Sequence, residues 1–163
     1  MVSNIKLDLE QGRTFRLITR SDMDGLVCAV ILKELGLIHE IVFAHPKDMQ
    51  DGTIKVSDQD ITANLPYVEG VYLCFDHHAS EVERIGDDLS NRVIDPEAPS
   101  AARVLFKYFD EYENSKMQNI SQEMMDAVDK ADSASFTKDE ILNPTGWVLL
   151  SFLMDKNRPW PFS

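Results

Sequence analysis

Short apolar runs typical of β-strands alternate with helical periodicity over the first part of the chain. The strand-like runs lie at residues 14–19 (TFRLIT), 39–45 (HEIVFAH), 53–57 (TIKVS), 70–75 (GVYLCF) and 91–95 (NRVID). Between the first two, residues 26–35 repeat apolar positions at helical spacing until Gly36, a residue type favoured just after a helix end. Strands that alternate with helices favour a parallel sheet. The pattern therefore predicts an α/β fold with a parallel sheet of about five strands flanked by helices.

The C-terminal third of the chain has helical periodicity. Ser100, Ser121 and Thr145 are residue types favoured at helix N-caps, and they precede the helical runs 101–113, 122–131 and 146–154. The final segment, NRPWPFS, contains two prolines and predicts an irregular tail. Because no Gly- or Ser-rich linker interrupts the sequence, we expect one domain over residues 1–155 and a tail over 156–163.

The negative net charge of the chain argues against binding to nucleic acids and to anionic membranes. Asp and Glu number 28 against 16 Lys and Arg, which gives a formal net charge of −12. Such a surface repels a phosphate backbone and anionic lipid, so we expect no binding to duplex nucleic acid or to membranes. The apolar runs are shorter than the roughly 20 residues that cross a bilayer. The N-terminus lacks a secretory signal pattern, which predicts a cytoplasmic location.

Acidic and imidazole side chains follow three of the predicted strands. In a parallel sheet the carboxyl ends of the strands share one edge, where ligands bind. Desolvating an Asp-His-His run behind a buried strand is costly unless a cation or hydrogen bonds compensate. Carboxylate oxygens and imidazole nitrogens without thiolates suit Mn²⁺ or Mg²⁺ better than structural zinc. The strand-end residues are Asp22, Asp24, Asp58, Asp60, Asp76, His77 and His78.

The order of these motifs resembles the DHH phosphoesterase superfamily. DMDG stands at 22–25 and DHHAS at 76–80, with an acid after the strand predicted between them. The superfamily includes exopolyphosphatases, family II inorganic pyrophosphatases and oligoribonucleases. The resemblance implies a centre of two Mn²⁺ ions, with Mg²⁺ as the alternative, that activates a water for attack on phosphorus. The metal ligands it implies are Asp22, Asp24, Asp60, Asp76, His77 and Asp132.

Two of these ligand assignments stay open at the level of sequence. Asp58 lies two residues before Asp60 and is the alternative to it. Asp129 lies about one helical turn before Asp132 and is an alternative in the same way.

Cationic and imidazole side chains near the motifs are candidates for phosphate contact. The resemblance places His78 close to metal and phosphate. Many members of the superfamily carry a His shortly before the first motif, whereas this chain reads ITRSD there. This departure implies that one metal site is weaker or differently filled. Arg20 lies beside the first motif, and we predict that it holds a phosphoryl oxygen together with His78. Arg84 and Arg103 fall in predicted helices and are interpreted as surface residues.

These features lead to a hypothesis about function. We expect a Mn²⁺-dependent phosphohydrolase that cleaves a phosphoanhydride or phosphodiester in a small phosphorylated substrate. Polyphosphate, pyrophosphate, a nucleotide and a short oligonucleotide are the candidates. Members of the superfamily usually add a C-terminal substrate-binding domain, and 163 residues cover little beyond the first domain. The alternative is therefore a metal- or phosphate-binding module without independent catalysis, whose site a homodimer or a separate covering domain completes.

Overall fold

A five-stranded sheet lies at the centre of the computed structural model, which describes residues 5–80, 90–111 and 114–154. All strand pairs are parallel, and the strand order is β2-β1-β3-β4-β5. The architecture confirms the predicted α/β fold and its helical C-terminal part. The predicted tail and Arg84 fall outside the described residues. The strands are β1 (Phe15–Thr19), β2 (Ile38–Phe43), β3 (Asp60–Ala63), β4 (Leu73–Asp76) and β5 (Arg92–Ile94).

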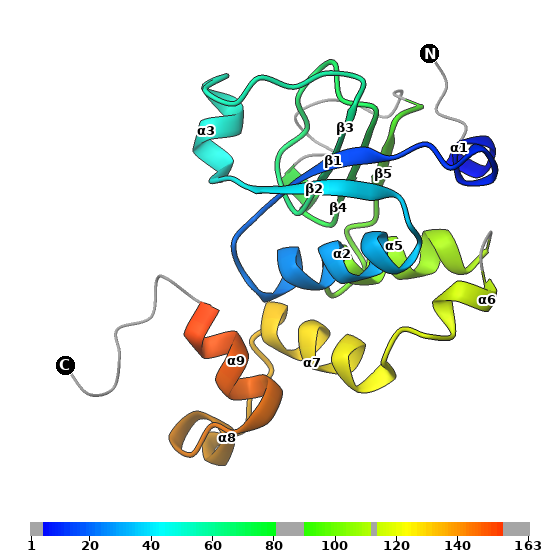
Figure 1. Cartoon of the computed structure of the whole chain (residues 1–163). Coiled ribbons are helices and arrows are strands. Elements are labelled where there is room, and N and C mark those ends of the chain that lie inside the picture. The colour runs from blue at the N-terminus through cyan, green and yellow to red at the C-terminus, as the bar shows by residue number, and fades with distance from the viewer. Residues whose placement is uncertain (1–4, 81–89, 112–113, 155–163) are drawn as a thin grey trace.

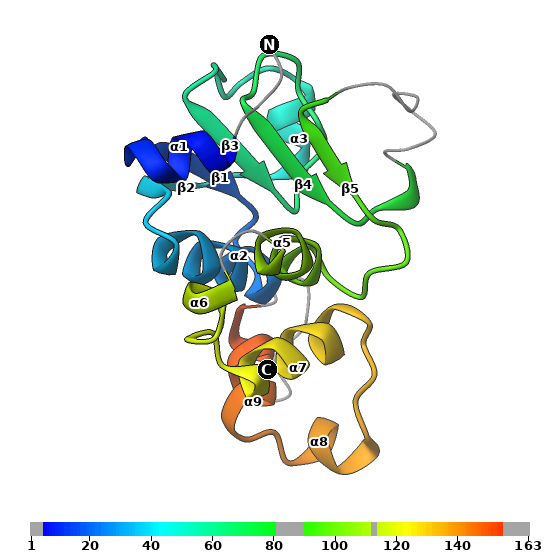
Figure 2. The same ribbon diagram turned by 90° about the vertical axis from the view of Figure 1, so that its right-hand side faces the viewer.

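Helices cover the two faces of the sheet unequally (Figures 1 and 2). Helices α2 and α5 pack on one face, and α7 and α9 form a further layer beneath them. None of the described helices is long and apolar enough to span a bilayer. The helices are α1 (Ile5–Gln11), α2 (Met23–Glu34), α3 (Pro46–Gln50), α5 (Ala101–Asp110), α6 (Asn114–Met117), α7 (Gln122–Asp132), α8 (Lys138–Leu142) and α9 (Gly146–Met154).

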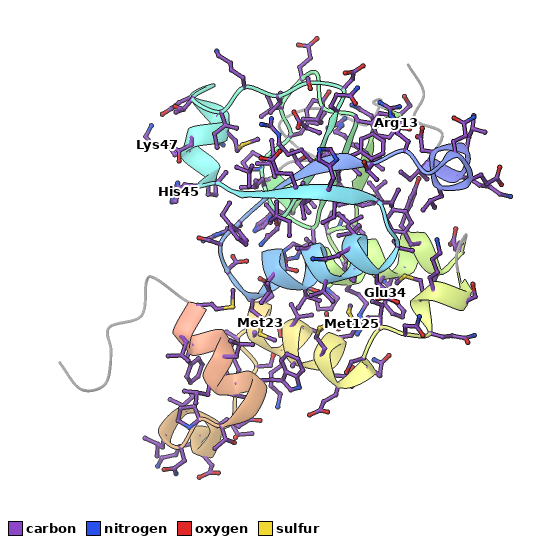
Figure 3. The ribbon with its side chains drawn as sticks, viewed as in Figure 1. Arg13, Met23, Glu34, His45, Lys47 and Met125 are labelled. Carbon is purple, nitrogen blue, oxygen red and sulfur yellow. The ribbon has the colours of Figure 1, made fainter. Side chains whose placement is uncertain are left out.

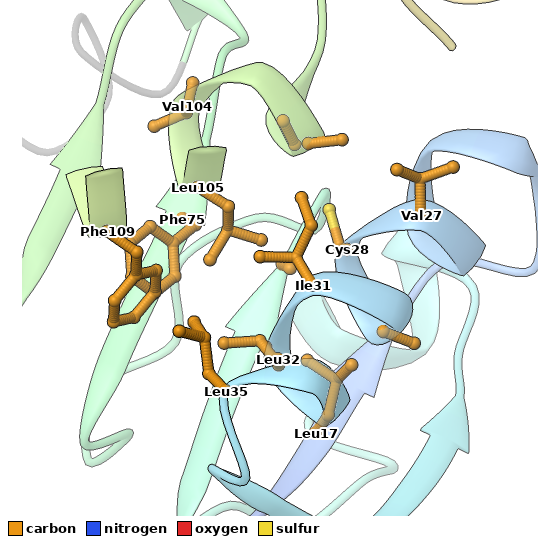
Figure 4. Close-up of a cluster of buried hydrophobic side chains, with 14 of the residues drawn as sticks. Leu17, Val27, Cys28, Ile31, Leu32, Leu35, Phe75, Val104, Leu105 and Phe109 are labelled. Carbon is orange, nitrogen blue, oxygen red and sulfur yellow. The ribbon is translucent and has the colours of Figure 1, made fainter. Parts of the chain in front are cut away.

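The main hydrophobic core lies between the sheet and the layer of α2 and α5 (Figure 4). Leu17 of β1 and Phe75 of β4 meet Ile31 of α2 and Phe109 of α5 there, all fully buried. Ile18, next to Leu17, points to the opposite face because side chains alternate along a strand. It packs in a smaller cluster with Met49 of α3 and with Ala44 and Leu65. Each of the large side chains stabilises the fold by about 1.5–3 kcal/mol through burial.

The third strand does not lie where the sequence pattern places it. Residues 53–57 were predicted as a strand, and this prediction is wrong, because β3 begins at Asp60. Ile54 and Val56 point their alternating apolar side chains into the smaller cluster from a loop. The alternation at 53–57 therefore reflects a loop packed on the sheet. Asp60 begins a strand and does not follow one.

The connections around β1 create a crevice at one edge of the sheet. After β1 the chain passes through α2 to β2 on one side, and it returns to form β3 on the other side. A strand order that reverses in this way leaves a crevice at the carboxyl ends of the two strands. Gly25 of α2 lies tight against this edge, since a Cβ there would be 1.9 Å from the carbonyl oxygen of Arg20. The close approach brings the first turn of α2 into the crevice.

Candidate functional site

Polar side chains from four segments meet at the carboxyl ends of β1, β3 and β4. The N-cap and first turn of α2 supply Asp22 and Asp24, and Asn64 follows β3 directly. The end of β4 supplies Asp76, His77 and His78, and the last turn of α7 supplies Asp132. Hydrogen bonds or ion pairs link residues of different segments. The described structure therefore brings five of the six predicted metal ligands to one edge of the sheet.

Asp24 is buried against the N-terminus of α5. Its carboxylate is 2% exposed and accepts hydrogen bonds from the backbone N–H of Ala101 (2.9 Å) and of Ala102 (2.8 Å). Both groups belong to the first turn of α5, where N–H groups lack partners within the helix. Burial raises the pKa of Asp24 to about 7, and the negative charge of Asp132 adds to this rise. Its ionised form therefore needs more positive charge than the two amides provide.

His77 is held between a backbone carbonyl and two carboxylates. Its Nδ1 donates to the carbonyl oxygen of Ala98 (3.3 Å), so the other nitrogen of the neutral ring carries the lone pair. This Nε2 lies 3.1 Å from Asp132 Oδ2 and 3.8 Å from Asp24 Oδ2. It is buried and has no partner with good hydrogen-bond geometry among the described residues. Burial lowers the pKa of His77, but its contact with Asp132 and the nearby carboxylate charges outweigh this and raise it to about 9.

His78 is oriented by the preceding acid. Its Nδ1 is 2.7 Å from Asp76 Oδ1, and its side chain is 47% exposed. Asp76 itself is 1% exposed. The hydrogen bond with Asp76 raises the pKa of His78, although burial opposes the rise. The ring of His78 therefore favours its protonated form, which suits contact with a phosphate oxygen.

These side chains form two overlapping groups of potential metal ligands. Asp24, His77 and Asp132 form one group, and Asp76, His77 and His78 form the other. Within each group the candidate ligand atoms lie within 4.8 Å of one another. In the neutral ring, the buried Nε2 of His77 has a lone pair but no hydrogen-bond partner among the described residues, and a cation could bind there. The donor set of oxygens and imidazole therefore fits a divalent cation.

Asp22 belongs to neither group and is bound by protein donors instead. Oδ1 accepts from the backbone N–H of Gly25 (2.9 Å) and from Asn64 Nδ2 (3.0 Å), and Oδ2 forms an ion pair with Arg20 Nε (3.1 Å). Burial raises the pKa of Asp22, while these three donors lower it. Arg20 thus stands beside the cluster.

Asn64 is a site residue that sequence reasoning missed. It is buried and has a positive φ of 57°, a conformation that non-glycine residues seldom adopt outside turns and functional sites. The signal available in the sequence was a polar residue directly after the apolar run ITA. The strand predicted at residues 53–57 lies too early in the chain, so the pattern does not mark Asn64 as a residue at a strand end.

Asp60 does not join the cluster. The pairing of Ala63 with Phe75 sets Asp60 four residues before the level of Asp76, or about 13 Å at the rise of a strand. It lies at the amino end of β3 and pairs with Arg16 Nε at 2.7 Å. The alternative residue, Asp58, is exposed in the loop before β3, at the same end of the sheet. The structure therefore brings neither acid to the other predicted ligands.

Asp129 and Asp132 point to different partners. The carboxylate of Asp129 accepts from Ser100 Oγ at 2.7 Å and from two nitrogens of Arg103 at 2.8 and 2.6 Å. This network links α7 to the start of α5, so Arg103 serves packing. Asp132 lies one turn later and faces His77. Of the two alternatives, the structure brings Asp132 to the cluster.

A pocket of about 820 Å³ opens beside the cluster at the carboxyl ends of β1 and β2. Its polar lining includes Arg20, Asp22, Asp24 and Asp132. Figure 3 labels two further lining residues, Met23 at the start of α2 and His45, whose ring caps α3. Aromatic side chains Phe43, Phe136 and Phe152 complete much of the wall. The pocket thus combines charged groups with apolar surface, as a site for a small charged ligand does.

Comparison with known proteins finds a phosphodiesterase among the solved structures. It is the pGpG-specific phosphodiesterase PggH from Vibrio cholerae, with a TM-score of 0.73 and 51% sequence identity. The match covers 87% of this chain and 45% of that chain, so this chain spans less than half the length of that enzyme. The similarity supports a DHH phosphoesterase-like fold. A scan against protein-family models finds no match, and neither does a search of curated proteins.

Proposed function

We propose that this chain carries the metal-binding part of a phosphodiesterase that acts on a small phosphorylated substrate. Identity of 51% to a pGpG-specific phosphodiesterase supports this proposal and makes a linear dinucleotide the first substrate to test. The observation that carries it is the buried Nε2 of His77, which faces two carboxylates without a hydrogen-bond partner among the described residues. A phosphoanhydride substrate, such as pyrophosphate or polyphosphate, remains the second candidate class.

Asp24, His77 and Asp132 would hold a divalent ion, with Asp76 and His78 close by. Mn²⁺ is the expected ion and Mg²⁺ the alternative, because the ligands mix carboxylate oxygen with imidazole nitrogen. A bound divalent ion lowers the pKa of a coordinated water and offsets charge on phosphoryl oxygens.

The surrounding residues would fix these groups in place. The amides of Ala101 and Ala102 hold the Asp24 carboxylate, and the carbonyl of Ala98 sets the tautomer of His77. Asp76 orients the ring of His78, whose raised pKa favours the protonated form. The protonated ring can donate a hydrogen bond to a phosphate oxygen and stabilise the charge that develops during hydrolysis.

Hydrolysis of pGpG by the purified chain tests the proposal. We expect turnover to GMP in the presence of Mn²⁺, its loss on chelation with EDTA, and its recovery on adding Mn²⁺ back. Pyrophosphate and polyphosphate measured in parallel define the substrate class. Absence of both Mn²⁺ binding and turnover would contradict the proposal.

Binding of Mn²⁺ without turnover would instead favour a module that needs further protein to complete its site. The short span of the match to the phosphodiesterase makes this the second candidate function. Apolar side chains on α8 and α9 are also open to solvent, with Leu142 66% and Leu153 51% exposed. A covering domain or a second copy of the chain would bury them. Light scattering on the chain that binds Mn²⁺ distinguishes a dimer from a monomer.

A further inference from the structure

The carboxylate of Asp22 is already occupied by donors from the protein. An ionised carboxylate offers about four lone-pair positions. Three of them face Gly25 N, Asn64 Nδ2 and Arg20 Nε at 2.9, 3.0 and 3.1 Å. The side-chain amide of Asn64 donates its N–H to Asp22. Asp22 therefore has little capacity left for a metal ion.

His77 limits the number of ions in a second way. Its Nδ1–H is used by the carbonyl of Ala98, which leaves the single lone pair of Nε2 for an ion. Both potential ligand groups depend on His77, and one lone pair binds one ion. Nε2 is directed at Asp132 and Asp24. In the second group, Asp76 Oδ1 is taken by His78 Nδ1 at 2.7 Å. The group of Asp24, His77 and Asp132 is thus the better formed of the two.

Arg20 supplies a permanent positive charge on the other side of Asp22. A guanidinium stays protonated at all physiological pH values and has five N–H donors in a planar fork. The ion pair with Asp22 engages Nε, and Arg20 also lines the pocket. The other N–H groups of the guanidinium can therefore donate hydrogen bonds to an oxygen of a ligand in the pocket.

We propose that the cluster binds one divalent ion, at Asp24, His77 and Asp132, and that Arg20 provides the second positive charge of the site. Asp22 and Asn64 hold Arg20 in place as a phosphate-binding residue. The inference rests on the proposed function and differs from the two-ion centre that the resemblance to the superfamily implies. Asn64 fits this arrangement because a neutral amide next to Asp22 adds no negative charge that would need a second ion.

Counting the bound ions tests the first half of the proposal. Mn²⁺ per chain is measured by elemental analysis after dialysis and by calorimetric titration, neither of which depends on activity. We expect about one ion per chain in the unmodified protein and in Asp22→Asn, and none in Asp132→Asn. Asp58→Asn is the matched control, since Asp58 is an exposed acid far from the cluster.

The possible counts separate this inference from the proposed function. Two ions per chain, one of which is lost in Asp22→Asn, would overturn the inference and leave the proposed function intact. No bound ion in the unmodified protein would overturn both. One ion that persists in Asp22→Asn supports the arrangement.

Phosphate affinity tests the second half. We expect Arg20→Met to weaken binding of GMP to the Mn²⁺-loaded chain by about tenfold or more, since a charge-assisted hydrogen bond is lost. Arg20→Lys should restore part of the affinity, because charge returns without the planar fork. The number of Mn²⁺ ions should stay at one in both variants. Unchanged affinity for GMP in Arg20→Met, or a change in the number of ions, would overturn the role of Arg20.

Discussion

Both ends of the parallel sheet carry a buried carboxylate, but among the described residues Asp60 at the amino end is paired with an arginine, whereas Asp24 at the carboxyl end is not. At the amino end, Asp60 accepts from Arg16 Nε at 2.7 Å, Arg16 Nη2 at 3.0 Å and the Ser57 amide at 2.7 Å. At the carboxyl end, Asp24 and Asp132 flank a histidine nitrogen that lacks a hydrogen-bond partner among the described residues. The charge of Asp60 is thus neutralised by the protein itself, whereas the carboxyl end is suited to bind a cation.

This difference shows that burial of an acid does not by itself indicate a functional site. Asp60 and Asp24 are almost equally buried. What separates them is the charge of their donors, since a guanidinium neutralises Asp60, while Asp24 accepts from two backbone amides and the thiol of Cys28, all of them neutral. A buried carboxylate without a matched cation costs free energy, and proteins retain such groups where they bind something.

Removing the imidazole of His77 should have the largest effect on the difference between the two ends of the sheet. We expect His77→Ala to weaken Mn²⁺ binding by at least about 100-fold, because even residues that only support metal ligands contribute about 10- to 100-fold. Calorimetric titration measures the affinity, and circular dichroism confirms folding. The control is His39→Ala, an exposed imidazole that contacts Thr14. Equal Mn²⁺ affinity in both variants would show that the carboxyl end does not bind the ion through His77.

Breaking the ion pair at the amino end should affect stability without affecting the site. We expect Arg16→Met to lower the free energy of unfolding by about 2 kcal/mol, less than for a fully buried pair because Arg16 is partly exposed. Mn²⁺ affinity should stay within about twofold. Urea denaturation measures the loss, and Lys47→Met, which breaks an exposed pair with Asp51, should cost less than about 1 kcal/mol. A parallel loss of Mn²⁺ affinity in Arg16→Met would mean that the two ends are coupled.

The dependence of Mn²⁺ affinity on pH should be a smaller effect than the two substitutions above. The ion needs an ionised Asp24 and a neutral His77, and both have raised pKa values, about 7 and about 9. Lowering the pH protonates Asp24 and keeps His77 protonated, so Mn²⁺ affinity should fall. We expect about a tenfold decrease per pH unit for each proton displaced. Titrations between about pH 6.5 and 8.5 would contradict this if the affinity stayed constant.

The sheet and the C-terminal helices were predictable because their patterns are long or strongly apolar. The second half of GVYLCF, Leu73 to Phe75, is buried on both sides in β4, and Ser100 caps α5 as its position before a helical run predicts. The strand predicted at residues 53–57 failed because a loop packed on a core also alternates apolar and polar side chains. The true third strand is short and begins with an ion-paired acid, so it has almost no periodicity of its own.

The same error explains what the sequence did not reveal about the site. A strand placed seven residues too early selected Asp60 and passed over Asn64, although Asn64 is the residue at the carboxyl end of β3. Asp24, His77 and Asp132 were found because their motifs lie next to correctly placed elements. Their roles as metal ligands stay predictions, because the structure shows only that these side chains lie close together. The donors on Asp22 come from tertiary contacts that no spacing rule encodes.

The hydrogen bonds from α5 to Asp24 make that helix a natural reporter of the state of the site. Ala101 and Ala102 donate their amides to the carboxylate, and these two backbone groups lie far along the chain from residue 24. Their nuclear magnetic resonance shifts and hydrogen-exchange rates depend on whether the acceptor is charged, protonated or shared with an ion. Two amides in the first turn of one helix can therefore be followed spectroscopically as the site fills, in the unmodified protein and without an attached probe.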